Sequence, residues 1–78
     1  MSFPLREGSM KFEYDSEADA AYIWLAGYEE ISEKQISGIS IDGMDGEIEI
    51  DLNGEGRVIG IEFVGASYIL PVEMIGKK

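Results

Sequence analysis

The chain contains no cysteine and no histidine among its 78 residues. Disulfide bonds, thiolate zinc sites, cysteine nucleophiles and histidine-based catalytic triads are therefore excluded. Basic residues are also scarce, since 6 Lys and Arg stand against 16 Asp and Glu, for a formal net charge of -10. This charge opposes binding to nucleic acid or to an anionic membrane, because both surfaces reward Lys and Arg.

Long apolar runs are missing as well. No stretch approaches the roughly 20 apolar residues of a membrane-spanning helix, and residues 1–10 lack the apolar centre of a signal peptide. We therefore expect a cytoplasmic protein that needs no cofactor and binds neither nucleic acid nor membrane. Apolar residues make up 45% of the chain and charged residues 28%, which is a globular composition.

The length predicts a single domain. Residues 1–9 contain Pro4 and Gly8 and show no period, so we expect a flexible N-terminal tail there, either a natural arm or a leader that precedes a start at Met10. Residues 10–78 then form one small β-rich domain. A domain of this size is marginally stable by itself, so dense packing, a bound ion or self-association must support it.

Most of the domain has the patterns of β-strands. Apolar and polar residues alternate in three segments, residues 10–15, 47–52 and 57–64. Residues 20–26 are apolar on both faces and predict a central strand, with a helix over residues 16–25 as the alternative. Residues 28–41 fit strand pieces interrupted near Gly38, or a helical turn followed by a strand.

Turn signals separate these segments. Two Asp-Gly pairs follow Ile41, and Asn53-Gly54 lies between two alternating segments, as in β-hairpins. Residues 66–75 differ, because Ser67 can cap a helix and Pro71 can open a turn, so we expect one or two helical turns covering one face. The sequence thus predicts an α+β, mostly β fold: a small antiparallel β-meander of about five strands with a short C-terminal helical segment.

The predicted core contains the large apolar side chains of these strands: Tyr22, Ile23, Trp24, Leu25, Ile50, Ile59, Ile61 and Phe63. One thin sheet and a short helix can hardly cover both faces of residues 20–26. We therefore expect a homodimer or a higher homo-oligomer that buries the remaining apolar surface.

Three stretches carry a resemblance to a known family. Residues 10–23 include the pattern Tyr-Asp-x-Glu-Ala-Asp-x-x-Tyr-Ile, residues 50–62 read Ile-Asp-Leu-Asn-Gly-Glu-Gly-Arg-Val-Ile-Gly-Ile-Glu, and Ala66-Ser67 follows. In this order they resemble the small prokaryotic family called domain of unknown function 2283. Two departures are Ser16, where the family often has Pro, and a longer middle over residues 37–46.

The resemblance implies a compact β-rich domain beginning near Met10, and it implies no known reaction. Some members of the family are encoded beside small toxin-like proteins. The resemblance therefore implies an antitoxin-like or partner-binding role.

Residues 51–62 have the oxygen spacing of a calcium-binding loop, with Gly at the sixth position. The metal ligands would be Asp51, Asn53, Glu55 and Glu62. An EF-hand needs a helix on each side, whereas both flanks here alternate with period two. We favour a plain hairpin and keep a divalent-cation or small-ligand binding module as the alternative function.

Glu47, Glu49 and Asp51 share one face of a predicted strand. Such a row is a solvated surface, a partner-binding surface for a basic protein or a set of ligands for a divalent cation. Our leading hypothesis is a non-enzymatic protein-interaction module, in its sharpest form an antitoxin-like partner of a small basic protein.

The first connection holds Asp15, Glu17 and Asp19. Paired carboxylates can act as general acid and base when their pKa values are driven apart. The plainer interpretation is turn chemistry, in which Asp15 and Asp19 accept backbone N–H groups and Glu17 is exposed. We favour the turn and expect no catalytic residues.

Overall fold

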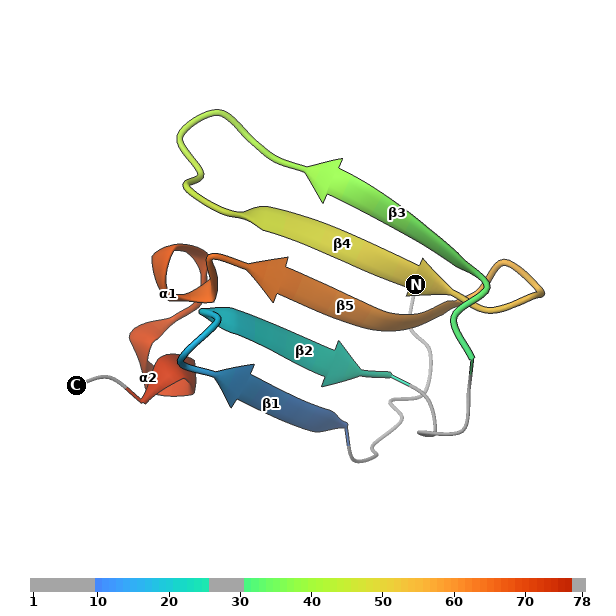
Figure 1. The fold of residues 1–78 in the computed structure, drawn as a ribbon, viewed down its shortest axis with the longest axis horizontal. Helices are drawn as coiled ribbons and strands as arrows, with labels where there is room; N and C mark the ends of the chain where they lie inside the picture. The colour runs from blue at the N-terminus through green and yellow to red at the C-terminus, as the bar shows by residue number, and fades with distance from the viewer. Residues whose placement is uncertain (1–9, 26–30, 77–78) are drawn as a thin grey trace, which may run out of the picture.

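The structure is a computed structural model that describes residues 10–25 and 31–76. Within these residues five strands form one antiparallel sheet, and two short helices follow (Figure 1). The predicted tail at residues 1–9 lies outside the described residues, as do residues 26–30. No helix in the described part of the chain is long and apolar enough to cross a membrane.

The strands are β1 (Lys11–Asp15), β2 (Ala20–Trp24), β3 (Lys34–Ile39), β4 (Glu47–Leu52) and β5 (Val58–Val64). Their spatial order is β1-β2-β5-β4-β3. The last three strands form a meander in which β5 pairs with β4, and the β1–β2 hairpin joins this meander along the other side of β5. The predicted α+β, mostly β antiparallel fold is confirmed, and the helical alternative for residues 16–25 is wrong.

One side of the sheet, here called the apolar face, carries two aligned rows of side chains that cross all five strands. The first row is Phe12, Ile23, Ile61, Ile50 and Ile36. The second row is Tyr14, Ala21, Phe63, Ile48 and Ile39. Period-two alternation in each strand sends the intervening residues to the opposite side, here called the acidic face.

The core is thinner than the sequence predicts. Among the described residues, the buried apolar side chains are Ala21, Ile59 and Ala66, and no large side chain is fully buried. The predicted core positions Tyr22 and Trp24 lie on the acidic face, and Leu25 is 42% exposed. The reason is that neighbouring residues of one strand point to opposite faces, so the apolar segment that contains β2 cannot enter a single core.

The helices α1 (Ala66–Ile69) and α2 (Val72–Ile75) lie at one end of the sheet, beside the start of β2 and the end of β5 (Figure 1). They close this end and leave the greater part of the apolar face without a helical layer. Pro71 precedes α2 as predicted. Ser67 does not cap α1, because Gly65 occupies the N-cap position and makes no side-chain hydrogen bond.

At this end of the fold the backbone near Gly46 packs closely against the backbone at the end of β5. Gly65 has a left-handed φ of 74°, and Gly46 packs directly against the chain there. A Cβ at Gly46 would collide with the carbonyl oxygen of Val64. The interruption predicted near Gly38 is also confirmed, because the register of β3 against β4 shifts between Ile36 and Ile39.

Candidate functional site

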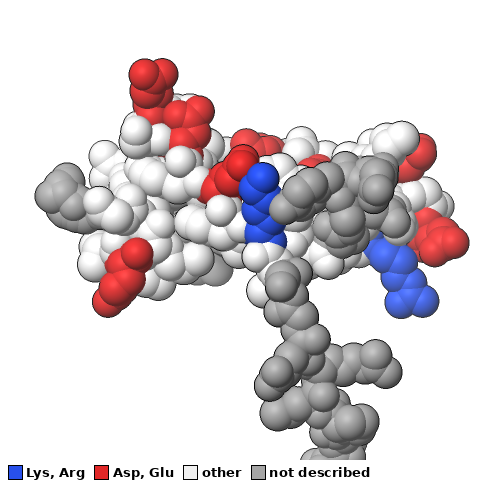
Figure 2. Space-filling view, turned by 90° about the horizontal axis from the view of Figure 1, so that it is seen from below, with Lys and Arg blue, Asp and Glu red and all other residues white. Residues whose placement is uncertain are grey.

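Carboxylates occupy two neighbouring rows of the acidic face. The register aligns Asp15, Ala20, Val64 and Glu47 in one row. It aligns Glu13, Tyr22, Glu62 and Glu49 in the next row. In Figure 2 most of the visible Asp and Glu side chains lie on the upper side. The strand order thus gathers acids of β1 with those of β4 and β5, which come much later in the chain.

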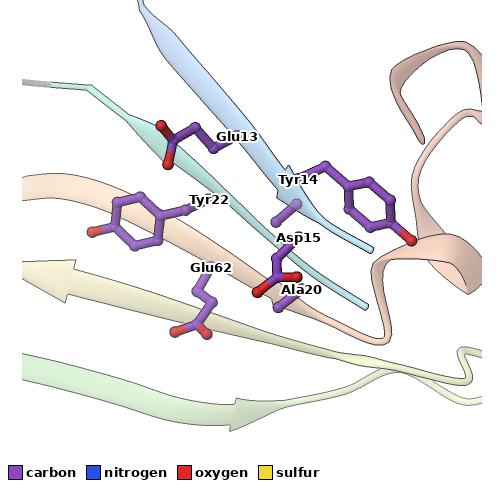
Figure 3. Close-up of a pocket in the computed structure, with 7 residues that line it drawn as sticks. Glu13, Tyr14, Asp15, Ala20, Tyr22 and Glu62 are labelled. Atoms are coloured by element: carbon purple, nitrogen blue, oxygen red, sulfur yellow. The ribbon is translucent and has the colours of Figure 1, made fainter. Parts of the chain in front are cut away.

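A hollow of about 440 Å3 opens on this face above Ala20. It is lined by Glu13, Tyr14, Asp15, Ala20, Ala21, Tyr22 and Glu62. Figure 3 shows Glu13, Tyr22 and Glu62 on the same side of the sheet, with the ring of Tyr14 turned away toward the helices. The space exists because a small residue, Ala20, stands between larger neighbours in the aligned rows.

The hollow is electrostatically unfavourable for the carboxylate of Glu62. Burial raises the pKa of Glu62, and the neighbouring charge of Glu49 and a hydrogen bond to it raise this pKa further. At the rim, Lys11 forms an ion pair with Glu13 at 3.0 Å and lies 5.5 Å from the ring centroid of Trp24. A cation that entered the hollow would relieve the repulsion between Glu62 and Glu49.

Asp51 anchors the aromatic wall of the hollow. Its carboxylate is buried and accepts hydrogen bonds from Tyr22 Oη at 2.5 Å, Gln35 Nε2 at 3.0 Å and Ser32 Oγ at 3.2 Å. Burial raises the pKa of Tyr22, and the hydrogen bond to Asp51 adds to this effect. The Tyr22 phenol lies over Gly60, where no Cβ could fit. Asp51 therefore fixes the position of Tyr22.

Asp19 anchors the other end of the hairpin. Its carboxylate accepts hydrogen bonds from Tyr14 Oη at 2.8 Å and from both the backbone N–H and the hydroxyl of Ser67, at 2.9 and 2.8 Å. These bonds, led by that of the Ser67 hydroxyl, lower the pKa of Asp19. The Asp19 carbonyl also accepts the N–H groups of Gly65 and Ala66. The β1–β2 turn is thus tied to the start of α1.

A comparison with known protein families identifies the family of this chain. Residues 11–67 match the family described as Protein of unknown function (DUF2283). The chain belongs to this family. No curated protein and no solved structure matches it. The suspected resemblance is therefore confirmed, and it covers the whole sheet and the start of α1.

The two aspartate anchors, Asp19 and Asp51, connect the three stretches that resemble DUF2283. Asp19 of the first stretch binds Ser67 of the third. Asp51 of the second stretch binds Tyr22 of the first. These polar residues of the pattern hold the fold together, and the acids that line the hollow are separate from both anchors.

Turn chemistry in the first connection is confirmed. Asp15 Oδ1 accepts the backbone N–H groups of Glu17 at 3.0 Å and Ala18 at 3.4 Å, and Glu17 is exposed. Asp19 accepts the N–H of Ser67 and holds a left-handed φ of 52°, a conformation that Asp tolerates better than most residues. A carboxylate with a lowered pKa that already accepts three hydrogen bonds is a poor general base.

The four predicted metal ligands are divided between two places. Asn53 Oδ1 accepts the N–H groups of Glu55 and Arg57 and so closes the hairpin turn, where Glu55 is exposed. Asp51 and Glu62 lie on the acidic face of the strands. Within residues 10–25 and 31–76, no group of three or more acidic side chains is arranged to hold a metal ion. The cation site stays a prediction that a calorimetric calcium titration checks.

The predicted partner-binding row Glu47, Glu49 and Asp51 does share one face of β4. Asp51 is occupied by internal hydrogen bonds, which leaves Glu47 and Glu49 for external contacts. Sequence reasoning missed that Glu13, Asp15 and Glu62 join this surface. The signal was present as matched alternation in β1 and β5, but the neighbours of β5 had to be known first.

Proposed function

We propose that this member of DUF2283 is a non-enzymatic protein-interaction module whose acidic hollow receives a basic segment of a partner protein. The observation that carries the proposal is the alignment of Glu13, Glu62 and Glu49 in one row across β1, β5 and β4, beside the open space above Ala20. This arrangement concentrates negative charge where a side chain can enter.

A Lys or Arg side chain suits this hollow for two reasons. Its charge would offset the mutual repulsion of Glu62 and Glu49, which adds to burial in raising the pKa of Glu62. Tyr22 and Trp24 stand edge to face with ring centroids 4.6 Å apart, and the contact of Lys11 with Trp24 is an internal example of the cation–aromatic pairing that a partner could repeat. Arginine, which pairs with carboxylates and stacks on rings, fits best.

A non-enzymatic role agrees with what the motif acids do. Asp15, Asp19 and Asp51 each accept hydrogen bonds that hold a turn or a neighbouring strand. The net charge of -10 supports a basic partner. The sharpest form of the proposal is an antitoxin-like role, in which the chain binds a small basic protein of its own host.

The test is affinity capture of partners from the host lysate by the full chain. The face variant carries Glu13→Gln, Glu49→Gln and Glu62→Gln. The control variant loses the same number of charges outside the hollow, through Asp42→Asn, Asp45→Asn and Glu55→Gln. Circular dichroism checks that both variants are folded.

We expect the wild type and the control variant to retain one stoichiometric basic protein, which the face variant loses and which rising salt releases. Purified partner then gives the dissociation constant for each variant. Equal loss in both variants, or a partner that binds independently of salt, contradicts a role for the acidic hollow.

A further inference from the structure

The apolar face has no second layer of structure in the described part of the chain. Its first row, from Phe12 on β1 to Ile36 on β3, crosses the whole sheet, yet none of its five side chains is buried. Ile36 remains 43% exposed. Stable domains bury such a face against another sheet or a helical layer, and the two short helices lie at one end (Figure 1).

Charge separates this face from the other one. The two aligned rows of the apolar face contain no carboxylate and no basic side chain, and the adjoining row carries Lys34 beside Leu52 at the edge of the sheet. Glu13, Glu49 and Glu62 point to the opposite side. Two copies of an acidic chain repel each other wherever their carboxylates meet. Contact through the apolar faces is the arrangement that keeps both acidic faces outside and apart.

The rows are also self-complementary. A two-fold axis between stacked sheets brings the row of one copy over the row of the other, with β1 over either β1 or β3 of the partner. Phe12 then meets either Phe12 or Ile36 of the second copy, and both contacts are apolar. Five strands about 4.8 Å apart, each of about six residues at about 3.3 Å per residue, give the whole face of the sheet a footprint of roughly 500 Å2 per copy.

Two such footprints bury on the order of 1,000 Å2, the lower limit for a specific interface. We infer that a second copy of this chain covers the apolar face, so that two sheets stack as a symmetric sandwich with the acidic faces outward. The dimer predicted from the sequence thus gains a defined surface, which differs from the acidic hollow and does not depend on the proposed function.

Sedimentation equilibrium of the full chain over a wide concentration range tests this inference. The key variant is Ile36→Glu, which places a charge in the interface on an exposed position of β3. The matched control is Ser37→Glu, the next residue of the same strand, which is also exposed and lies on the opposite side. Ile36→Thr keeps the branched shape and serves where Ile36→Glu fails to fold.

We expect wild type and Ser37→Glu to sediment with twice the monomer mass of 8.6 kDa. Ile36→Glu should raise the dimer dissociation constant on the order of 100-fold, because each copy would bury an unpaired charge. A wild-type monomer at every concentration overturns the inference. A dimer that Ile36→Glu and Ile36→Thr leave unchanged also overturns it, since the interface would then lie elsewhere.

Discussion

The apolar and acidic faces of the sheet are made by the same strands, but different forces hold them. The apolar face depends on packing among Phe12, Ile23, Ile61 and their neighbours, which accepts apolar side chains of similar volume. The acidic face depends on directional hydrogen bonds to Asp51, which only particular donors can supply. Tyr22 and Asp51 are therefore specified by the hydrogen bond between them, whereas Ile23 and Ile61 need only the right size and an apolar surface.

Loss of the Asp51 carboxylate is the strongest test of this contrast. We expect Asp51→Ala to lower the free energy of unfolding by about 3 kcal/mol, because it removes a buried charged acceptor and leaves several donors without it. Glu49→Ala, on the same strand and face, should not lower the free energy of unfolding, because it removes a charge that repels Glu62. Urea denaturation followed by circular dichroism gives both values. Equal effects of the two substitutions would mean that Asp51 is no more important than an ordinary solvated acid.

A larger residue at position 60 tests the packing of Tyr22 against the sheet. A Cβ there would collide with the Tyr22 phenol, so Gly60→Ala should lower the free energy of unfolding by about 2 kcal/mol. The penalty should shrink in a Tyr22→Ala background, where the obstacle is gone. Gly54→Ala is the matched control, because its nearest neighbour would be Glu33 Cγ at 3.6 Å. A penalty that persists without Tyr22 would place the constraint in the backbone.

The Asp19 anchor lies in the β1–β2 turn at the end of the sheet and should have a smaller effect with a distinct pH dependence. Its folded pKa lies below the ordinary value of 3.8, so the anchor stabilises the fold above that pH and loses this contribution as pH falls through the lowered pKa. Ser67→Ala should therefore reduce stability at neutral pH and have little effect in strong acid. Ser40→Ala, in an exposed loop, is the control for thermal melts across this pH range.

Removing the charge of Glu62 should have the smallest effect on the free energy of unfolding, and it should stabilise the fold rather than destabilise it. Because the folded pKa of Glu62 lies above its ordinary value of 4.5, ionisation of Glu62 destabilises the fold, and stability falls as pH rises through the folded pKa. Glu62→Gln should raise the free energy of unfolding by about 0.5 kcal/mol at neutral pH. The gain should vanish below the ordinary pKa, and Glu55→Gln in the exposed turn should show no such gain.

Much of the local structure could be predicted from residue patterns. The clean alternation over residues 47–52 predicts β4 with the bounds that the structure has, and Gly38 marks the irregularity in β3. The role of Asp15 as a turn acceptor also follows from local chemistry. These predictions succeed because each depends on contacts or backbone preferences within a few residues.

The candidate site and the core could not be predicted in the same way. Nothing local shows that β2 pairs with β5, and this pairing alone brings Glu13 and Glu62 to one hollow and Tyr22 to Asp51. Because the strand order was not known, Tyr22 and Trp24 were predicted to lie in the core. The structure places their side of β2 on the acidic face.

By itself, the sequence determined the strands, the turns, the family and the separation of apolar from acidic side chains, because a period of two acts within each strand. Only the tertiary structure decided which acids stand together, which aspartates act as anchors and which apolar side chains of the sheet the two helices leave uncovered. Those outcomes depend on pairing between segments far apart in the chain, and pairing energies are spread over the whole sheet rather than encoded at any one position.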